Sequence, residues 1–232
     1  MTAPTPPLDP TLAARVAAAA AVLRRGGLVA YPTETWYGLG ALATDGAAVE
    51  RVVHAKRRPE EKPLPLLAAD LAQVEALADL PPLARRLADA FWPGPLTLVV
   101  PVRQGVRLHR AISGEAGTVG IRVSSGPVSA ALARAAGGAL VATSANLSGE
   151  PPVAEVAALD PALVARLDLV LDGGTAPGGL PSTVVAVAGD SFTVLRAGAV
   201  TVEALAAARD AGGPTGQPPA RDSGLAPSGA GG

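Results

Sequence analysis

The chain has no cysteine and only two histidines, and neither sign of charge predominates. The absence of cysteine excludes disulfide bridges, thiolate metal sites and catalysis by a thiol. Two histidines also argue against a zinc site built on imidazoles. With 19 basic and 20 acidic residues the formal net charge is −1. Any site for a nucleic acid, a phosphate or another anion must therefore be local, since the surface as a whole does not attract anions.

Long apolar runs are also missing, because glycine, proline and charged residues recur throughout the sequence. No run approaches the roughly 18 to 20 residues that a transmembrane helix needs. The alanine and valine run at 16–22 resembles the apolar core of a signal peptide, but Asp9 and Arg15 precede it and no basic segment does. We interpret this run as part of a helix and expect a soluble, cytoplasmic protein without a membrane partner.

Apolar spacing along the 232 residues predicts one large α/β domain. We expect helices at 12–23, 45–54, 71–77, 83–91, 128–136, within 153–167 and at 202–208. We expect strands at 28–31, 96–102, 119–123, 140–143, 169–171, 184–187 and 192–195. Helices separate most of these strands, but only a short turn with Gly189 and Asp190 separates the last two. This order predicts a mixed parallel and antiparallel sheet.

The ends of the chain differ in composition from the folded part. We expect a flexible N-terminus at 1–10, the folded domain at 11–209 and a disordered tail at 210–232. The tail is rich in glycine, proline and serine and has too few apolar residues to offset the entropy that ordering would cost.

The segment YPTETWYGLG at 31–40 follows a predicted buried strand and gathers hydroxyls, a carboxylate and aromatic rings. Open α/β sheets bind their ligands at such strand ends. The alternative is a simple turn in which Thr33 and Thr35 cap backbone groups. Glu34 is the acid in this segment that could serve a metal or a proton transfer.

The segment HAKRRPEEKP at 54–63 carries the densest positive charge. Lys56 and Arg58 could both contact a triphosphate, the arginine as a fork and the lysine as a point charge. The alternative is a solvated helix end whose cations complement the helix dipole.

Two further segments of small polar residues end predicted strands, VATSANLSG at 141–149 and the stretch from DGG to PST at 172–183. Short side chains and exposed backbone N–H groups suit phosphate or carboxylate oxygens, but they also form ordinary Asx and Ser/Thr turns. The Trp92 turn, WPGPLT, favours a structural role. The sequence has no P-loop and no GxGxxG pattern, so a nucleotide site would be of another kind.

Taken together and in order, these segments resemble the YrdC-like family of threonylcarbamoyl-AMP synthases over about residues 12–208. Several unrelated strings in a fixed order are more specific than any one of them. The strings are PTETWYGLG (32–40), K-x-R at 56–58 with KPL at 62–64, WPGPLTLV (92–99), TVGIRV (118–123), ATSANLSG (142–149), DGG (172–174), PSTVV (181–185) and LRAGAVT (195–201).

The resemblance implies a twisted mixed sheet with flanking helices that lines a basic concave cleft. ATP and L-threonine would bind there side by side and react with bicarbonate to give threonylcarbamoyl-AMP and pyrophosphate. Mg²⁺ is expected on the ATP phosphates, held mainly by phosphate oxygens and water, without a carboxylate cage. A downstream threonylcarbamoyl-transferase complex would then modify position 37 of tRNA, and a weak direct contact with tRNA stays open.

The resemblance also assigns roles to residues of this chain. It places the catalytic, phosphate-binding set at Lys56, Arg58, Ser144 and Asn146, with further ATP contacts at Thr118 and Arg196. It places the threonine-binding positions at Thr35, Arg122, Thr143 and Ser182. Arg122 would be the partner of the amino-acid carboxylate.

Three positions depart from the family pattern. Leu67 stands about where some longer relatives have a histidine that helps to bind threonine, Trp36 replaces a small or β-branched residue, and Ala197 replaces a proline. The few residues after the domain imply the short form of the family. Two alternatives stay open: a double-stranded RNA or tRNA-binding module of the same fold, and a paralogue with a different carbamoyl chemistry, as in hydrogenase maturation factors. The intact K-x-R and S-x-N motifs favour the synthase.

Overall fold

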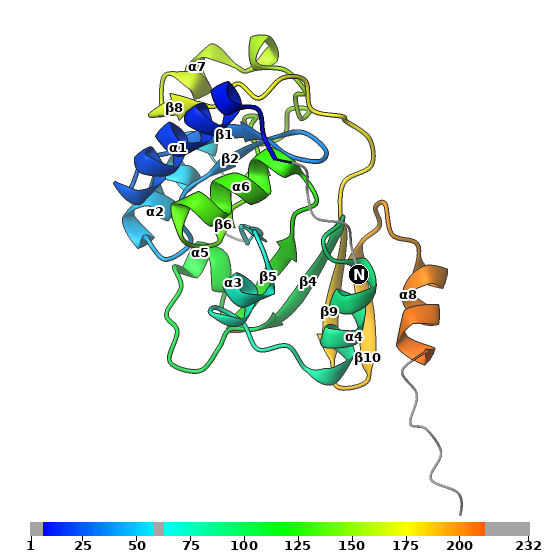
Figure 1. The fold of residues 1–232 in the computed structure, drawn as a ribbon. Helices are drawn as coiled ribbons and strands as arrows, with labels where there is room; N and C mark the ends of the chain where they lie inside the picture. The colour runs from blue at the N-terminus through cyan, green and yellow to red at the C-terminus, as the bar shows by residue number, and fades with distance from the viewer. Residues whose placement is uncertain (1–6, 58–62, 212–232) are drawn as a thin grey trace, which may run out of the picture.

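The computed structural model describes residues 7–57 and 63–211, which form an α/β fold with two mixed sheets and flanking helices (Figure 1). The helices are α1 (Pro10–Arg24), α2 (Gly46–Lys56), α3 (Leu71–Glu75), α4 (Pro82–Phe91), α5 (Arg110–Ser113), α6 (Pro127–Ala136), α7 (Pro161–Val164) and α8 (Val202–Asp210), with a 3-10 turn η1 (Val156–Ala158). The strands are β1 (Val29–Pro32), β2 (Tyr37–Gly40), β3 (Leu66–Ala68), β4 (Leu96–Pro101), β5 (Thr118–Val123), β6 (Leu140–Val141), β7 (Thr143–Ser144), β8 (Leu169–Val170), β9 (Thr183–Ala188) and β10 (Ser191–Arg196).

Each predicted helix or strand overlaps an observed element, and the α/β class is confirmed. The sequence missed β2, β3 and α5, which are three or four residues long. The expected flexible N-terminus and disordered tail fall mainly on residues 1–6 and 212–232, outside the described residues. Within the described residues, no helix is both long and apolar enough to span a membrane.

The strands form a four-stranded sheet in the order β7-β2-β1-β8 and a six-stranded sheet in the order β10-β9-β4-β5-β3-β6. Parallel pairs, such as β3 with β5 and β4 with β9, lie beside antiparallel pairs, such as β4 with β5. The last two strands form the predicted antiparallel hairpin. In Figure 1 the connection from β8 to β9 runs from the smaller sheet down to the larger one.

The predicted strand at 140–143 is divided between the two sheets. β6 pairs with β3 in the larger sheet, whereas β7 pairs with β2 in the smaller one. At the crossing, the Ala142 N–H donates to the carbonyl oxygen of Pro65 at 2.8 Å, and the Val141 N–H donates to that of Ala41 at 2.9 Å. The chain therefore passes from the larger to the smaller sheet at Ala142, and Thr143 and Ser144 belong to the smaller sheet.

Helices α1 and α6 pack together over strands of both sheets (Figure 1). The Asp9 carboxylate caps α1 by accepting from the Thr11 and Leu12 N–H groups, each at 3.0 Å, which satisfies donors that a helix start leaves unpaired. The wholly buried Leu23 and Leu132 lie in this layer. Leu67 is also wholly buried there, so its side chain belongs to the core.

Helix α2 ends beside the crossing point. The Asp45 carboxylate caps its start by accepting from the Ala48 N–H at 3.0 Å, as the sequence predicts. Arg57 then takes a left-handed conformation with φ of 51° and ends the helix. The Ser148 N–H donates to the carbonyl oxygen of Lys56 at 3.2 Å. The last turn of α2 is thus fixed against the segment that follows β7.

Candidate active site

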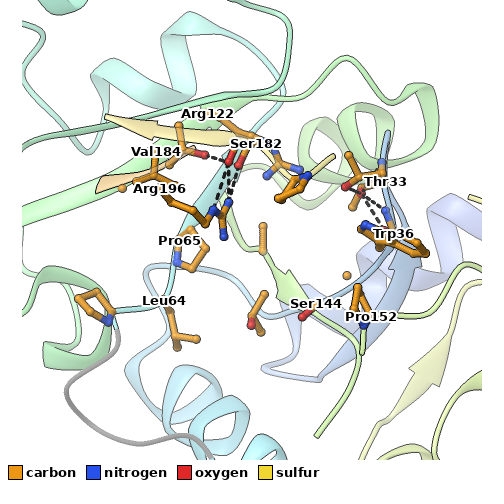
Figure 2. Close-up of a pocket in the computed structure, with 18 of the residues that line it drawn as sticks. Thr33, Trp36, Leu64, Pro65, Arg122, Ser144, Pro152, Ser182, Val184 and Arg196 are labelled. Atoms are coloured by element: carbon orange, nitrogen blue, oxygen red, sulfur yellow. Dashed lines mark hydrogen bonds between the residues drawn. The ribbon is translucent and has the colours of Figure 1, made fainter. Parts of the chain in front are cut away.

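A cavity of about 730 Å³ lies between the two sheets. Its lining comes from the β1–β2 turn and β7 on one side and from β4, β5, β9 and β10 on the other. The lining residues with hydroxyl or charged side chains are Thr33, Glu34, Thr35, Tyr37, Thr97, Thr118, Arg122, Thr143, Ser144, Ser182 and Arg196. Figure 2 shows Ser182 and Arg196 on one side of this space, with Ser144 and Pro152 across from them.

The β1–β2 turn is held by the hydroxyl of Thr33. This hydroxyl donates to the carbonyl oxygen of Trp36 at 2.7 Å and accepts from the N–H groups of Thr35 and Trp36 at 3.2 and 3.3 Å (Figure 2). The carbonyl oxygen of Thr35 accepts from the Gly178 N–H at 2.6 Å. Thr33 therefore caps backbone groups of the turn, as the alternative interpretation predicts. Both Thr33 and Thr35 also line the cavity.

Arg122 and Glu34 form an ion pair on the cavity wall. Arg122 Nε and Nη2 both contact Glu34 Oε1, at 2.9 and 2.8 Å. The Ser124 hydroxyl donates to Glu34 Oε2 at 2.6 Å and lies 2.8 Å from the Ser129 hydroxyl. The side chains of Arg122 and Glu34 are only 8% and 12% exposed. Such shielding from water strengthens charge-assisted hydrogen bonds.

The surroundings of Glu34 keep its carboxylate ionised. Burial by itself would raise the pKa of Glu34, but the charge of Arg122 and the hydrogen bonds from Ser124 and Arg122 outweigh it, and the pKa lies below its ordinary value of 4.5. The carboxylate is therefore an acceptor for its neighbours at neutral pH.

Ser182 and Arg196 form a second polar group on the wall. Arg196 Nη2 donates to the carbonyl oxygen and the hydroxyl of Ser182 at 2.8 and 3.0 Å, and Thr97 Oγ1 lies 3.0 Å from that hydroxyl (Figure 2). Burial lowers the pKa of Arg196, and the charge of Arg122 lowers it further. The guanidinium groups of Arg122 and Arg196 therefore both bring positive charge to the cavity.

Close backbone approach fixes the Ser182 segment. A Cβ on Gly198 would lie 2.2 Å from the carbonyl oxygen of Pro181 and 2.6 Å from the nitrogen of Thr183. The Thr183 hydroxyl donates to the carbonyl oxygen of Val200 at 2.7 Å and accepts from the Val200 N–H at 2.9 Å. Only glycine fits this contact, which places Ser182 at the cavity.

Lys56 supports the segment that carries Ser144. Its ammonium donates to the carbonyl oxygens of Ser144 and Asn146, both at 2.5 Å, and the residue is 2% exposed. Asn146 donates through Nδ2 to the carbonyl oxygens of Leu147 and Glu150 at 2.9 and 2.6 Å. Its Oδ1 is buried without a hydrogen-bond partner within the described residues.

Seven of the ten predicted site residues line the cavity: Thr35, Thr118, Arg122, Thr143, Ser144, Ser182 and Arg196. Lys56 and Asn146 do not line the cavity, but both contact Ser144: the Lys56 ammonium and the Asn146 N–H donate to its carbonyl oxygen. Arg58 lies outside the described residues. Leu67, which stands where some longer relatives have a threonine-binding histidine, lies in the core and not in the cavity lining, whereas Trp36 lines the cavity.

Sequence reasoning missed the pairing of Arg122 with Glu34 and the two serines that hold Glu34 in turn. Glu34 was singled out only as a general candidate, and Ser124 and Ser129 were not singled out at all. They come from β1–β2, from the end of β5 and from α6, so their meeting depends on the fold. The density of polar groups in PTET was the available signal. Within residues 7–57 and 63–211, no three His, Asp or Glu side chains come together in a way that could hold a metal ion.

Comparisons with known proteins show the family to which the sequence is similar. The sequence model of the Sua5/YciO/YrdC family, described as "Telomere recombination", matches residues 21–198. A Threonylcarbamoyl-AMP synthase of Stenotrophomonas maltophilia is 47% identical over 165 residues, which cover 70% of this chain and 87% of the relative. The protein of the same name from Bacillus subtilis is 40% identical over 194 residues, covering 83% of this chain and 56% of the relative.

Solved structures share the fold. The P. abyssi Sua5 structure complexed with L-threonine superposes with a TM-score of 0.76 and 36% identity, covering 84% of this chain and 57% of that one. E. coli YciO superposes with a TM-score of 0.75 and 27% identity, covering 87% and 96%. A nucleotide-bound HypF structure, at 22% identity and a TM-score of 0.67, shows the fold alone. With a family match over most of its length, this chain belongs to the Sua5/YciO/YrdC family.

Proposed function

We propose that this chain is an L-threonylcarbamoyladenylate synthase. The observation that carries the proposal is the convergence of the family's separate motifs on one cavity, where Arg122 and Ser144 face each other from different sheets. Relatives named Threonylcarbamoyl-AMP synthase at 40 and 47% identity support an enzyme of the transferase type. The nucleotidyl-transfer chemistry from ATP is the finer part of the proposal.

The reaction joins three substrates in two steps. The neutral amine of threonine attacks the carbon of bicarbonate, and loss of water gives a carbamate. A carbamate oxygen then attacks the α-phosphorus of ATP, the bond from that phosphorus to the bridging oxygen breaks, and pyrophosphate leaves. A carbamate decomposes readily in water, so the two steps need one enclosed space. The cavity of about 730 Å³ between the two sheets would hold the reactants together.

The chain contributes positioning and charge. Arg122 would bind the carboxylate of threonine, with Thr35, Thr143 and Ser182 as further contacts to the amino acid. Ser144, Thr118 and Arg196 would contact the nucleotide, together with Lys56, Asn146 and Arg58. Arginine forks and hydroxyl donors suit the charge that develops on phosphate oxygens. No protein nucleophile is needed.

Mg²⁺ would enter as part of the MgATP substrate. The cavity carboxylate of Glu34 is already bound by Arg122 and Ser124, so phosphate oxygens and water would supply most of its ligands. Transfer of the product to tRNA by a separate threonylcarbamoyl-transferase complex, and a cytoplasmic location, are further parts of the proposal.

Pyrophosphate release from ATP tests the proposal. Release should require both L-threonine and bicarbonate, and Ser144→Ala or Arg58→Ala should abolish it while the fold is retained. Ser191→Ala, a hydroxyl on the exposed hairpin turn, is the matched control and should behave as the wild type. Binding of tRNA without any turnover would instead contradict the proposed function and favour an RNA-binding module.

A further inference from the structure

Arg122 presents only part of its guanidinium to the cavity. Its Nε and Nη2 groups are both held by Glu34 Oε1. Nη1 makes no hydrogen bond within the described residues, and the residue lines the cavity. A guanidinium has five N–H groups in a fixed plane, so anchoring one edge fixes the direction of the rest. The edge formed by Nη1 and the second N–H of Nη2 is therefore the part of the guanidinium that can bind a carboxylate.

Glu34 is itself anchored at its second oxygen. Oε2 accepts from the Ser124 hydroxyl at 2.6 Å, and the Gly126 N–H donates to Ser124 Oγ at 3.1 Å. The Ser129 hydroxyl lies 2.8 Å from Ser124 Oγ and donates to the carbonyl oxygen of Gly126 at 3.1 Å. Ser124 and Ser129 are 2% and 0% exposed. The carboxylate is therefore fixed to the start of α6 by a buried chain of hydroxyls.

The backbone of Gly126 also approaches Glu34 closely. A Cβ on Gly126 would lie 2.9 Å from the Glu34 nitrogen and 3.2 Å from Oε2. Gly126 thus allows the β1–β2 turn to approach the segment between β5 and α6. This contact brings a carboxylate from the smaller sheet onto an arginine of the larger sheet.

We propose that Glu34 is the positioning residue of the amino-acid site, holding Arg122 so that Nη1 receives the carboxylate of the substrate. This inference rests on the proposed function and deepens it. Glu34 acts through Arg122 and does not take a proton in the reaction. Protonation would weaken the contacts with two Arg122 nitrogens and one hydroxyl, and these contacts hold the pKa of Glu34 below its ordinary value.

Steady-state kinetics of Glu34→Gln test the proposal. The variant keeps the shape of the side chain but removes the charge that holds Arg122. We expect the KM for L-threonine to rise about 10-fold or more, with kcat and the KM for ATP changed less than about 2-fold. Ser124→Ala, which frees the other oxygen, should raise the same KM by a smaller factor. The matched control is Glu75→Gln, because Glu75 pairs with Arg85 on the surface at 2.5 Å and should leave all constants unchanged.

A carboxylate-free substrate separates positioning from a general structural effect. Wild type should strongly prefer L-threonine to its amide, because only the acid uses the charge of Arg122. In Glu34→Gln this preference, measured as the ratio of kcat/KM values, should fall about 10-fold. A merely structural role would lower both values together. In a double-mutant cycle, Arg122→Lys should cost less in the Glu34→Gln background than in wild type.

Several results would overturn the inference. An unchanged threonine KM and an unchanged preference over the amide in Glu34→Gln would do so. A fall in kcat at constant KM, with loss of the acidic limb of the pH profile, would identify Glu34 as a proton acceptor instead. If Glu34→Gln does not fold, Ser124→Ala decides by the same two readouts. If the wild type releases no pyrophosphate but binds L-threonine in calorimetry, the proposed function is refuted. The role of Glu34 is then still tested by the affinities of the variants for threonine and for its amide. If the wild type binds no threonine, both the proposed function and the positioning role of Glu34 are refuted.

Discussion

Lys56 offers the sharpest test of how the segment after β7 is held. Its ammonium donates to the carbonyl oxygens of Ser144 and Asn146. Lys56→Met keeps the length and apolar stem of the side chain but removes the ammonium donor from both oxygens. The Asn146 oxygen then has no donor within the described residues, whereas the Ser144 oxygen keeps the Asn146 N–H at 3.0 Å. An unpaired buried polar group costs about 1–3 kcal/mol.

The magnitude follows from two opposing terms. Lys56→Met would orphan the Asn146 carbonyl group at a cost of about 1–3 kcal/mol. The Ser144 carbonyl group would lose a charge-assisted hydrogen bond worth about 1.5–3 kcal/mol but would still accept from the Asn146 N–H at 3.0 Å. The variant recovers part of this sum because it no longer buries a charge. We expect a net loss of about 2–3 kcal/mol in the free energy of unfolding. For a chain of this size that corresponds to a fall of about 4–12 °C in Tm.

Thermal unfolding and amide hydrogen exchange measure this effect. Exchange of the amides at 143–148 should rise in Lys56→Met without any ligand, and the affinities for both threonine and ATP should fall because Thr143 and Ser144 lie in this segment. Arg166→Ala is the control, since Arg166 Nη1 donates to the carbonyl oxygen of Ala55 at 2.9 Å at the same helix end but away from the cavity. Unchanged exchange and threonine affinity, with only ATP binding weakened, would refute this reasoning and make Lys56 a phosphate ligand alone.

Three more perturbations follow from the contacts. Gly198→Ala places a Cβ 2.2 Å from the carbonyl oxygen of Pro181, so we expect a loss of about 1–3 kcal/mol in urea unfolding and weaker substrate binding through displaced Ser182. Gly40→Ala places a Cβ 2.7 Å from both Tyr31 Cε1 and the Val141 carbonyl oxygen, and a similar loss should appear in the same assay; wild-type stability in either variant would contradict the geometry. The pKa of Glu34 is lowered on folding, so its contribution to stability is present above its ordinary value of 4.5 and is lost as the pH falls through the folded value. Wild type should therefore lose its stability advantage over Glu34→Gln below about pH 4.5, and a constant difference down to pH 2 would show that Glu34 does not titrate as inferred.

Local patterns predicted most elements because their signals are themselves local. The Asp45 cap and the hairpin at 184–195 depend on residues that are close in sequence, and both are observed. The change of sheet at Ala142 was not predicted. The apolar run at 140–143 shows that a strand is favoured but carries no information about its partner, which is β3 before Ala142 and β2 after it.

The sequence identified many of the residues that line the site but not the contacts between their side chains. Motif positions identified seven residues that line the cavity, but Glu34 and Arg122 are 88 residues apart, and nothing local joins them. His109 shows the same limit. The sequence around His109 suggests no acidic partner, yet its side chain is only 29% exposed, and its Nε2 lies 3.1 Å from Oε2 of Glu50 on α2. Pair contacts of this kind depend on how distant elements pack.

The charges at the cavity bear on how the substrates are accommodated. Among the described lining residues, Arg122 and Arg196 carry positive charge and Glu34 carries negative charge, which leaves one net positive charge. MgATP and bicarbonate together bring about three negative charges, because Mg²⁺ cancels two of the roughly four on ATP. The cavity alone therefore does not balance its proposed substrates. Under the proposed function, further positive charge would come from Lys56, whose ammonium contacts the Ser144 carbonyl oxygen, and from Arg58 and Lys62, which lie outside the described residues. Since Glu34 already occupies one edge of Arg122, the proposed function would assign that arginine to the single charge of an amino-acid carboxylate and the K-x-R segment to the phosphates.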